Sequence, residues 1–423
     1  MSVTIPSFAF RTGPSVYIAL AVFLLVVQAA LFAQTATPIY SFSAPPDVVG
    51  VRSQLVFDAA GNAYGTSETG GAYNYGGVFQ LTPPAFPGGP WVETIIHSFD
   101  GGPNGTAGPN QLAIDTLGNL YGTTQAGKGA GCQSSACGRV FTLVRPSSPS
   151  GAWGFHVLHR FAGGIGDGSN PVFGVVLIGN KKYGTTMNGG PNGGGIVYEL
   201  APSNEGYTEK IIYSFPGYSG DGSLPVGLTR DAEGNLYGVT LGGGAGGGVV
   251  FKLTPPASGS GSWTESVLFS PDNATYGNEL ADAPVLDKAG ALWGTTQYGG
   301  PGNAGTLFRL SPPSVSGGQW QPTLIHAFDL NTEGLQNGAL LYERSANTVY
   351  GMTPGLNVNC GSIFQVTETS SGVWTYSTAY TFSSPAVGCN PNLPLNLDGS
   401  GNLFGVALDG GANGYGSAFQ FTP

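Results

Sequence analysis

One short segment, Gly-Asn-Leu-Tyr-Gly-Thr-Thr at residues 118–124, returns to the end of the chain at nearly constant spacing. Successive copies lie 54 to 62 residues apart. They are centred on one aromatic residue each: Tyr64, Tyr121, Tyr183, Tyr237, Trp293, Tyr350 and Phe404. A period of this length, with short strands and glycine-rich turns inside it, is typical of propellers and repeat arrays. Seven copies of one unit therefore account for the chain after its first forty or so residues.

Repetition also explains how so long a chain can bury its apolar residues. The chain has 423 residues, more than the roughly 250 to 300 that one core supports, but each repeat packs only on its neighbours. Glycine and proline, 72 and 31 residues, would alone indicate low complexity, and the 41% hydrophobic content argues against disorder. Charged residues make up 9% and the net charge is -10, so no basic stripe is available for phosphates and we expect no nucleic-acid partner.

The N-terminus has the pattern of an export sequence. Arg11 precedes an apolar run from Val16 to Ala33 that ends in small residues, which predicts a secretory signal peptide over residues 1–33. The run also nears the length of a membrane span. An uncleaved N-terminal anchor is therefore the alternative, and it would be the protein's one contact with a membrane. In both cases we expect a secreted, cell-surface or periplasmic protein.

Each repeat contains four short apolar runs with strand character, separated by turn residues. In the second repeat they cover residues 111–115, 120–124, 139–143 and 154–161. Four antiparallel strands per repeat match one propeller blade.

The phase of the repeat predicts a closed ring. Residues 39–42 match the fourth strand of other repeats, such as 95–99 and 211–215, and the chain ends after a third strand at 418–421. If the first strand completes the last blade, no sheet edge is left unpaired between the termini. We therefore predict an all-β fold over residues 38–423: a seven-bladed β-propeller of four-stranded antiparallel blades, closed by the N-terminal strand.

Two sets of recurrent residues have structural interpretations. Aspartates before turns that end in glycine, usually Gly-Asn, accept backbone N–H groups there. We favour this over a calcium loop because such a site needs several converging oxygens. These aspartates are Asp58, Asp115, Asp231, Asp287 and Asp398. Tryptophans introduce the fourth strands, and we interpret them as packing residues of the outer blade edge rather than as sugar-stacking groups. They are Trp91, Trp153, Trp263, Trp320 and Trp374.

The histidines do not form a catalytic pattern. His97, His159 and His326 occupy a strand position that Tyr40, Tyr213, Phe269 and Tyr380 hold in other repeats, so we interpret them as space-filling, and His156 lies in the same strand as His159. None has the arrangement of a nucleophilic triad or the spacing of a zinc protease. The glycine-rich segment 242–248 lacks the Gly-Lys-Ser/Thr of a phosphate loop. We expect no metal ion and no cofactor, and the absence of these sequence patterns favours a protein without catalytic activity.

Four cysteines in an exported chain suggest two disulfides. Cys132 and Cys137 lie in one loop between the second and third strands of the second repeat. Cys360 lies in the corresponding loop of the sixth repeat, and Cys389 lies between that repeat and the next. A bridge between Cys360 and Cys389 would tie adjacent blades, although spacing alone leaves the pairing open. Metal ligation is the alternative, but it lacks a CxxC pair or partner histidines.

The predicted ligand-binding face carries the loops between second and third strands and between fourth and first strands. Aromatic and acidic residues among Gly, Asn and Ser are suited to a polar neutral ligand such as a glycan. The candidates are Tyr73, Tyr75, Tyr218, Tyr298 and Tyr415, with Asp100, Asp167, Asp221 and Asp409. The alternative is that these are ordinary solvated loop residues. Paired carboxylates also suit a glycosidase, but the sequence places no two at a working separation.

Three parts of the repeat together resemble a known family. Gly-Asn-Leu-Tyr-Gly-Thr-Thr is followed by a segment such as Gly248 to Pro255, Gly-Val-Val-Phe-Lys-Leu-Thr-Pro, and by one such as Ile211 to Phe215, Ile-Ile-Tyr-Ser-Phe. This pattern resembles the GloVer-type (Gloeo_Verruco) tandem repeat of exported bacterial proteins over nearly all of residues 38–423. The resemblance implies a secreted or surface protein built from repeats and supplies no catalytic residues to transfer.

These observations favour an extracellular binding or structural module, whose partner would be a polysaccharide or another surface protein. One alternative is a carbohydrate-active propeller enzyme, a lyase or hydrolase, that uses the loop carboxylates of the predicted face. Another is an adhesion or matrix component with no defined small ligand.

Overall fold

The structure is a computed structural model of the chain. It describes residues 34–101, 108–125, 132, 137–148, 151–217, 221–257, 259, 261–280, 282–315, 317–335, 338–355 and 360–423. The predicted signal peptide, residues 1–33, lies outside the described residues. Within the described ranges the chain forms strands and turns, and no helix there is long and apolar enough to cross a membrane.

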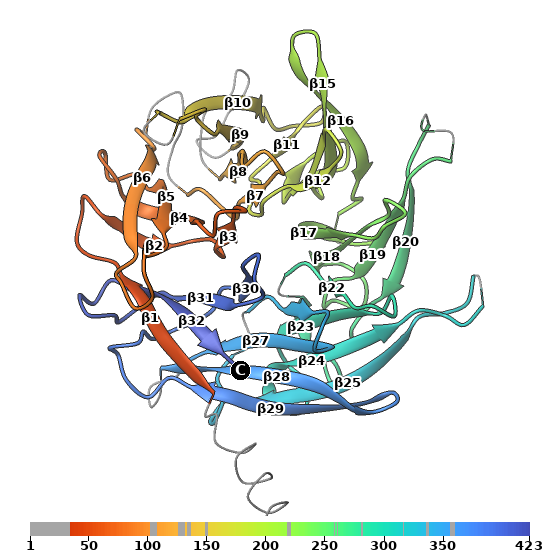
Figure 1. The fold of residues 1–423 in the computed structure, drawn as a ribbon. Coiled ribbons are helices and arrows are strands. Elements are labelled where there is room, and N and C mark those ends of the chain that lie inside the picture. Colours follow the sequence, from red (N-terminus) through yellow and green to blue (C-terminus); the bar gives the residue numbers. More distant parts are fainter. Residues whose placement is uncertain are drawn as a thin grey trace, which may run out of the picture.

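Seven antiparallel sheets stand side by side in a ring around one axis (Figure 1). The prediction of a seven-bladed β-propeller is therefore confirmed. Blade 1 contains β2 (Val48–Val51), β3 (Val56–Phe57), β4 (Ala63–Gly70), β5 (Gly77–Thr82) and β6 (Val92–Ser98). Blade 2 contains β7 (Ala113–Ile114), β8 (Leu120–Thr124), β9 (Arg139–Val144) and β10 (Gly154–Arg160). Blade 3 contains β12 (Val176–Ile178), β13 (Lys181–Thr186), β15 (Ile196–Ser203) and β16 (Gly206–Ser214), with the short pair β11 (Gly168–Ser169) and β14 (Asn188–Gly189) beside it.

The remaining blades follow the same order. Blade 4 contains β17 (Ser223–Arg230), β18 (Leu236–Gly242), β19 (Val250–Thr254) and β20 (Thr264–Phe269). Blade 5 contains β21 (Asn278–Leu280), β22 (Val285–Leu286), β23 (Leu292–Tyr298), β24 (Asn303–Ser311) and β25 (Gln321–Asp329). Blade 6 contains β26 (Leu341–Glu343), β27 (Thr348–Pro354), β28 (Gly361–Ser370) and β29 (Val373–Thr381). Blade 7 contains β30 (Asn396–Leu397), β31 (Leu403–Ala407), β32 (Ser417–Thr422) and the N-terminal strand β1 (Thr35–Ser41).

The two ends of the described chain close the ring, as predicted. β1 pairs antiparallel with β32, from Thr35 opposite Thr422 to Ser41 opposite Ser417 (Figure 1). The strand begins at Thr35, before the predicted start at residue 39. It includes Pro38, which an outer edge strand tolerates because its outward side needs no ladder hydrogen bond. Phe42, just after the strand, is fully buried against blade 1.

The inner strand of blade 2 is shorter than predicted. β7 covers two residues where the sequence predicts a strand over 111–115. Before it, Pro109 still forms a bridge with Thr124 of β8, and the Asn110 N–H donates to the Thr123 carbonyl at 3.0 Å. The Asn110 side chain also donates hydrogen bonds to Thr123 Oγ1, at 3.0 Å, and to the Pro171 carbonyl of blade 3, at 2.7 Å. Near the axis the blades crowd one another, and this segment contacts the neighbouring blade as well as β8.

Within each blade, the glycine of the recurrent segment lies opposite an aromatic residue of the third strand, whose side chain covers it. A Cβ atom added to any of these glycines would lie 2.2 to 2.7 Å from that aromatic side chain. An aromatic side chain across a strand glycine restores the packing that the missing side chain leaves open. The pairs are Gly65–Phe79, Gly122–Phe141, Gly184–Tyr198, Gly238–Phe251, Gly294–Phe308, Gly351–Phe364 and Gly405–Phe419.

The same aromatic residue also joins adjacent blades. Its ring contacts a phenylalanine at the end of the preceding blade's outer strand at all seven seams, with ring centroids 5.1 to 5.6 Å apart. Five of the seven pairs are edge-to-face, the geometry that aromatic quadrupoles favour, and the other two are tilted. The pairs are Phe42–Phe79, Phe99–Phe141, Phe161–Tyr198, Phe215–Phe251, Phe269–Phe308, Phe328–Phe364 and Phe382–Phe419.

A second layer of aromatic contacts uses the predicted outer tryptophans. Each is half-buried and packs on the central aromatic residue of the preceding repeat. The interpretation of these tryptophans as packing residues is therefore confirmed, and the structure identifies the residue that each one contacts. The pairs are Trp91–Phe404, Trp153–Tyr64, Trp263–Tyr183, Trp320–Tyr237 and Trp374–Trp293. At the seam between blades 2 and 3, Lys182 lies between the rings of Tyr121 and Tyr207 instead.

The turn aspartates do more than close turns. Asp115 accepts hydrogen bonds from the backbone N–H groups of Leu117 and Asn119, each at 2.9 Å, which confirms the turn interpretation. Its second oxygen accepts the Tyr121 hydroxyl at 3.1 Å. The turn therefore also fixes the central aromatic residue that the next blade packs against, and Asp58 and Asp231 repeat the arrangement.

Both predicted disulfides are present. Cys132 bonds to Cys137 within one loop of blade 2. Cys360 bonds to Cys389 and so joins the loop before β28 in blade 6 to the segment before β30 in blade 7. The expectation that this bridge ties adjacent blades is confirmed.

The glycine–aromatic pair predicts a selective cost for a single methyl group. We expect Gly238→Ala to lower the free energy of unfolding by about 1 to 3 kcal/mol, because the Phe251 ring must leave its position. Gly399 has no atom within 4 Å of an added Cβ, so Gly399→Ala should change stability by less than about 0.5 kcal/mol. Urea unfolding of both variants measures this, and equal losses would contradict it.

The closing seam predicts that the first strand is anchored by Phe42. We expect Phe42→Ala to lower the free energy of unfolding by about 3 to 5 kcal/mol, since it removes a fully buried ring from the contact between blades 7 and 1. Ile165, 81% exposed, supplies the matched control Ile165→Ala. A Phe42→Ala variant as stable as this control would show that β1 does not hold the ring closed.

Candidate functional site

The segments that interrupt the inner strands surround the axis of the ring. In every blade, the equivalent residue of these segments lies two positions before the residue that pairs with the central aromatic residue. These residues are Gln54, Gln111, Gly174, Gly227, Ala283, Ala339 and Pro394. Four of the seven are glycine or alanine. A Cβ on Gly174 would lie 2.6 Å from the Gln111 carbonyl oxygen, and one on Gly227 would lie 2.7 Å from the Ala283 Cβ. Small residues are needed here because neighbouring blades nearly touch.

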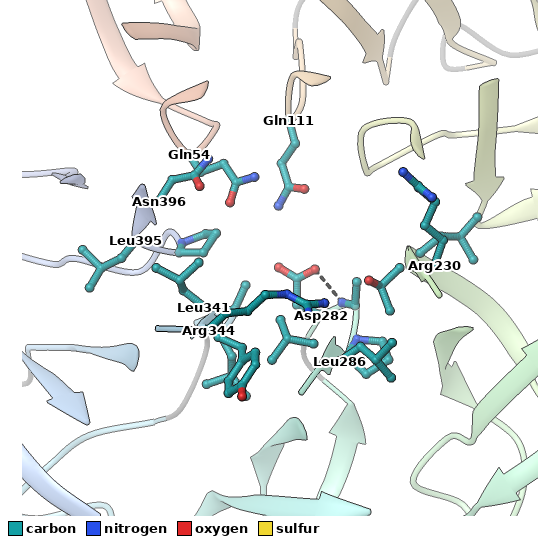
Figure 2. Close-up of a pocket in the computed structure, with 18 residues that line it drawn as sticks. Gln54, Gln111, Arg230, Asp282, Leu286, Leu341, Arg344, Leu395 and Asn396 are labelled. Carbon is teal, nitrogen blue, oxygen red and sulfur yellow. Dashed lines mark hydrogen bonds between the residues drawn. The ribbon is translucent and has the colours of Figure 1, made fainter. Parts of the chain in front are cut away.

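A cavity of ≈ 350 Å³ opens next to this ring of residues (Figure 2). It falls within the range of small-molecule sites, which runs from about 300 to 1,000 Å³. The carboxyl group of Asp282 and the carboxamide of Gln111 point into the cavity, and the Arg344 side chain crosses it. Further lining residues are Gln54, Asn396, Arg230, Leu286, Leu341 and Leu395.

Asp282 is the one carboxylate among the described residues that line this cavity. The six equivalent positions in other blades hold residues without an ionisable side chain: Ser53, Asn110, Phe173, Val226, Gly338 and Leu393. Asp282 is half-buried, and the surrounding protein desolvates its carboxyl group. Burial raises the pKa of its carboxyl group to about 7, opposed by the hydrogen bond that it accepts from the Ala283 N–H, at 2.6 Å, and by the nearby Gln111 side chain. This carboxyl group can therefore donate as well as accept a hydrogen bond near neutral pH.

A second cavity of ≈ 380 Å³ shares Gln111, Asp282 and Pro394 with the first. Its wall includes the ion pair between Arg52 and Glu68. It lies on the side where the inner strands begin, which is the predicted ligand-binding face, whereas Arg230 and Arg344 place the first cavity near the turns where these strands end. Asp282 therefore stands where a channel from each face meets the axis.

The predicted loop tyrosines lie outside both cavities. Tyr73, Tyr75, Tyr298 and Tyr415 are exposed, with Tyr73 at 59%, and none is among the residues that line either cavity. The Tyr75 ring packs over Gly101. Tyr218 lies outside the described residues. A ligand-binding role for these tyrosines stays a prediction.

The predicted loop carboxylates already contact other residues of the protein. Asp167 accepts the Ala162 N–H at 2.7 Å, Asp221 accepts the Tyr213 hydroxyl, and Asp409 accepts the Asn390 side-chain amide at 3.2 Å. Asp100 interacts electrostatically with His97. None of the four lines the two cavities. These contacts shape the loops, and a role in ligand binding stays a prediction for this set as well.

The described repeats agree with a known family. Residues 131–364, more than half of the chain, match the model of the Gloeobacter/Verrucomicrobia repeat. The chain belongs to the Gloeobacter/Verrucomicrobia repeat family. No curated protein matches it in sequence.

Solved structures show the same fold as this Gloeobacter/Verrucomicrobia repeat protein. An extracellular domain of a putative hybrid two-component system from B. thetaiotaomicron is similar, with TM-score 0.50 and 14% identity over 92% of this chain. The match covers 41% of that longer protein. A protein from Lactobacillus plantarum has TM-score 0.53 and 14% identity over 82% of this chain and 95% of its own. The β-propeller domain of Cps50 (Swd1) from Myceliophteria thermophila has TM-score 0.52 and 11% identity over 92% of this chain and 98% of its own. At these identities the likeness shows the propeller fold alone.

The histidines of this Gloeobacter/Verrucomicrobia repeat protein divide into two kinds. His97 stacks on Phe155 with ring centroids 4.2 Å apart, and burial lowers its pKa to about 4, as a space-filling ring requires. His159 and His326 instead face carboxylates, Asp167 at 3.3 Å and Glu333 at 3.0 Å. The space-filling interpretation is incomplete for these two, because their partners lie in the following loop at spacings that differ between repeats.

The recurrent motifs of the sequence do not predict Asp282 or the channel. Asp282 belongs to no recurrent motif, and Gln111, which lines the same cavity, lies three blades away in sequence. One observation pointed to it: a carboxylate stands between apolar residues at a position where other repeats have neutral ones.

The raised pKa of Asp282 predicts a loss of stability on going from pH 5 to pH 8. A carboxyl group with a folded-state pKa of about 7 stabilises the fold fully below its unfolded pKa near 4, and this contribution is lost as the pH rises through 7. Asp282→Asn keeps a neutral side chain, so its free energy of unfolding should fall less over this interval. Urea unfolding at both pH values compares the two proteins, with Glu205→Gln at an exposed hairpin residue as control. Equal pH dependence in all three would contradict the prediction.

Proposed function

We propose that the protein is an exported binding module that holds a small hydroxyl-rich ligand, of the carbohydrate class, in its central channel. The observation that supports this most is the desolvated carboxyl group of Asp282 within a cavity of ≈ 350 Å³. Around it, Gln54, Gln111 and Asn396 carry carboxamides that both donate and accept hydrogen bonds. A sugar hydroxyl does the same, so the groups are complementary.

The apolar part of the lining fits the same ligand class. Leu286, Leu341 and Leu395 supply apolar surface next to the polar groups. Small-molecule sites combine mostly apolar walls with a few polar groups that fix orientation. The C–H faces of a sugar ring would contact the leucines while its hydroxyl groups reach Asp282 and the carboxamides.

Export is supported by the cysteines and by the N-terminal sequence. Both pairs of cysteines form disulfides, and disulfides persist mainly in oxidising compartments outside the cytosol. The apolar run of residues 16–33 supplies the predicted route of export.

Binding is favoured over turnover by the composition of the cavity. Among the described residues that line it, Asp282 is the one carboxylate, and no histidine, cysteine or serine joins it. A glycosidase of the usual kind needs two carboxyl groups at a set separation. Three of the loop carboxylates of the enzyme alternative accept hydrogen bonds from the protein itself, so an enzyme is the weaker proposal.

We expect Asp282→Ala to weaken sugar binding by about tenfold or more, because a hydrogen bond to a buried carboxyl group is worth about 1 to 3 kcal/mol. Saturation-transfer NMR of the purified protein with neutral mono- and disaccharides identifies a ligand, and calorimetry measures its affinity. Tyr298→Ala should leave that affinity unchanged.

Two outcomes would overturn the channel as the site. Loss of binding in Tyr73→Ala or Tyr298→Ala, with Asp282→Ala intact, would place the ligand on the loop face. No binding of any sugar by the unaltered protein would favour the adhesion or matrix alternative.

A further inference from the structure

Four seams of the propeller carry the same polar arrangement outside the channel. In each, a ring residue of the outer strand contacts a carboxylate seven or eight positions later, in the loop that leads to the next blade. The pairs are Tyr40–Asp47, His159–Asp167, Tyr213–Asp221 and His326–Glu333.

The next blade adds a third residue at a constant position. It occupies the outer strand four residues before that blade's own ring residue. In the order of the four pairs, it is Glu93, Glu209, Glu265 and Tyr376. Tyr376 donates its hydroxyl to Glu333 at 2.8 Å. The three glutamates differ from it, because Oε1 of each is buried without a hydrogen-bond partner among the described residues.

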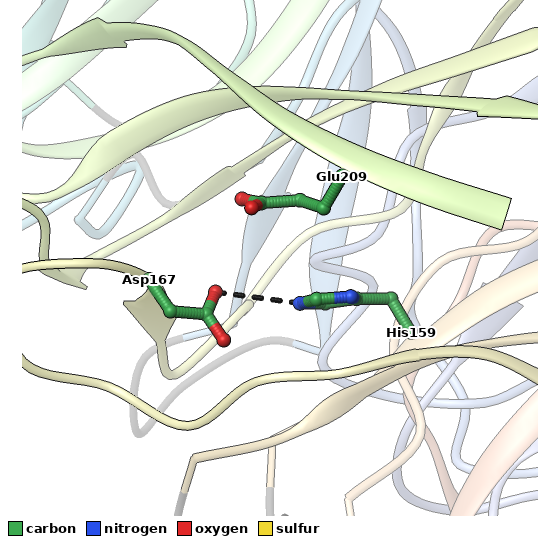
Figure 3. Close-up of side chains that lie close together, drawn as sticks. All are labelled: His159, Asp167 and Glu209. Carbon is green, nitrogen blue, oxygen red and sulfur yellow. Dashed lines mark hydrogen bonds and ion pairs between the residues drawn. The ribbon is translucent and has the colours of Figure 1, made fainter.

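One of these seams, between blades 2 and 3, combines a histidine with two carboxyl groups (Figure 3). The ligand atoms of His159, Asp167 and Glu209 all lie within 4.8 Å of one another. His159 comes from β10 of blade 2, Glu209 from β16 of blade 3, and Asp167 from the loop between the blades. We propose that His159, Asp167 and Glu209 bind a divalent transition-metal ion, with Zn²⁺ the best fit, and that this ion clamps blade 2 to blade 3.

The distances suit zinc. With metal–ligand bonds of about 2.0 to 2.1 Å, the ligand atoms of a tetrahedral site lie roughly 3.3 Å apart. His159 Nε2 and Asp167 Oδ1 are already 3.3 Å apart. Glu209 needs only a rotation of its flexible side chain to bring one oxygen to the same separation. Three protein ligands leave the fourth position to water, as in open zinc sites.

The donor set selects the class of metal. Imidazole nitrogen together with carboxylate oxygen suits zinc and similar transition metals, whereas calcium and magnesium prefer oxygen alone. A divalent cation would give the buried Glu209 Oε1 the partner that it lacks. It would also compensate two neighbouring carboxyl groups in a partly desolvated seam.

Surrounding contacts hold the first ligands in place. Asp167 accepts the Ala162 N–H at 2.7 Å and the Gly168 N–H at 2.6 Å, and the His159 ring lies edge-on to Phe161. Such outer contacts orient metal ligands before the ion arrives.

The chain supplies its own controls. The seam of Tyr213, Asp221 and Glu265 differs from the proposed site in one residue, the ring residue of the outer strand. The seam of His326 and Glu333 keeps the histidine but has Tyr376 in place of the glutamate. We expect neither to bind zinc.

Calorimetric titration of zinc chloride into the EDTA-treated, purified protein tests the proposal. We expect one zinc ion per chain and a rise in Tm on binding. His159→Tyr should abolish binding and leave the metal-free Tm almost unchanged, because tyrosine fills the same position at three other seams. Glu209→Gln should weaken binding by about tenfold or more. His326→Tyr and His156→Ala should leave both stoichiometry and affinity unchanged.

A gain of function makes the test sharper. Tyr213→His completes the same three ligand types at the seam between blades 3 and 4, so this variant should bind two zinc ions per chain. The proposal is overturned if the unaltered protein binds no zinc or if His159→Tyr binds zinc as the unaltered protein does. It is also overturned if His156→Ala, rather than His159→Tyr, loses zinc binding.

Discussion

The contact between a strand glycine and the aromatic side chain across it supports the whole ring. In each blade the missing side chain of the glycine makes room for an aromatic residue of the next strand, as Gly238 does for Phe251. That ring then reaches the preceding blade, where Phe251 meets Phe215 with centroids 5.1 Å apart. One position therefore fills the blade and joins it to its neighbour. The recurrent segment keeps its glycine because any larger residue would push this ring out of both contacts.

Seven equal seams leave little space at the axis, and the channel results from departures from the repeat. Gly174, Gly227 and Ala283 let the blades approach closely, while Gln54 and Gln111 extend side chains into the space that remains. Asp282 enters this space from one blade alone. Its carboxyl group is desolvated by residues of several blades, which is why a single departure from the repeat produces a distinctive group at the centre of the molecule.

The seams show the same principle away from the axis. One strand position accepts Tyr, Phe or His because each ring packs well there, so the fold tolerates exchange among them. Their polar atoms meet different partners in the following loop and in the next blade. A position that is structurally interchangeable is therefore chemically variable, and the seam of His159, Asp167 and Glu209 is the one that assembles three metal-ligating groups among the described residues.

By itself the sequence determined the number of blades, their four strands and the closing role of the first strand, whereas the structure decided which cysteines pair. The blades, strands and closure follow from features that every repeat keeps, since a constant period places equivalent residues at equivalent positions in space. Tertiary structure alone decided the sites. Asp282 meets Gln111 across the axis, and Glu209 reaches His159 across a seam. Periodicity encodes what repeats share, whereas a cavity or an ion site depends on the individual residues that different repeats bring face to face.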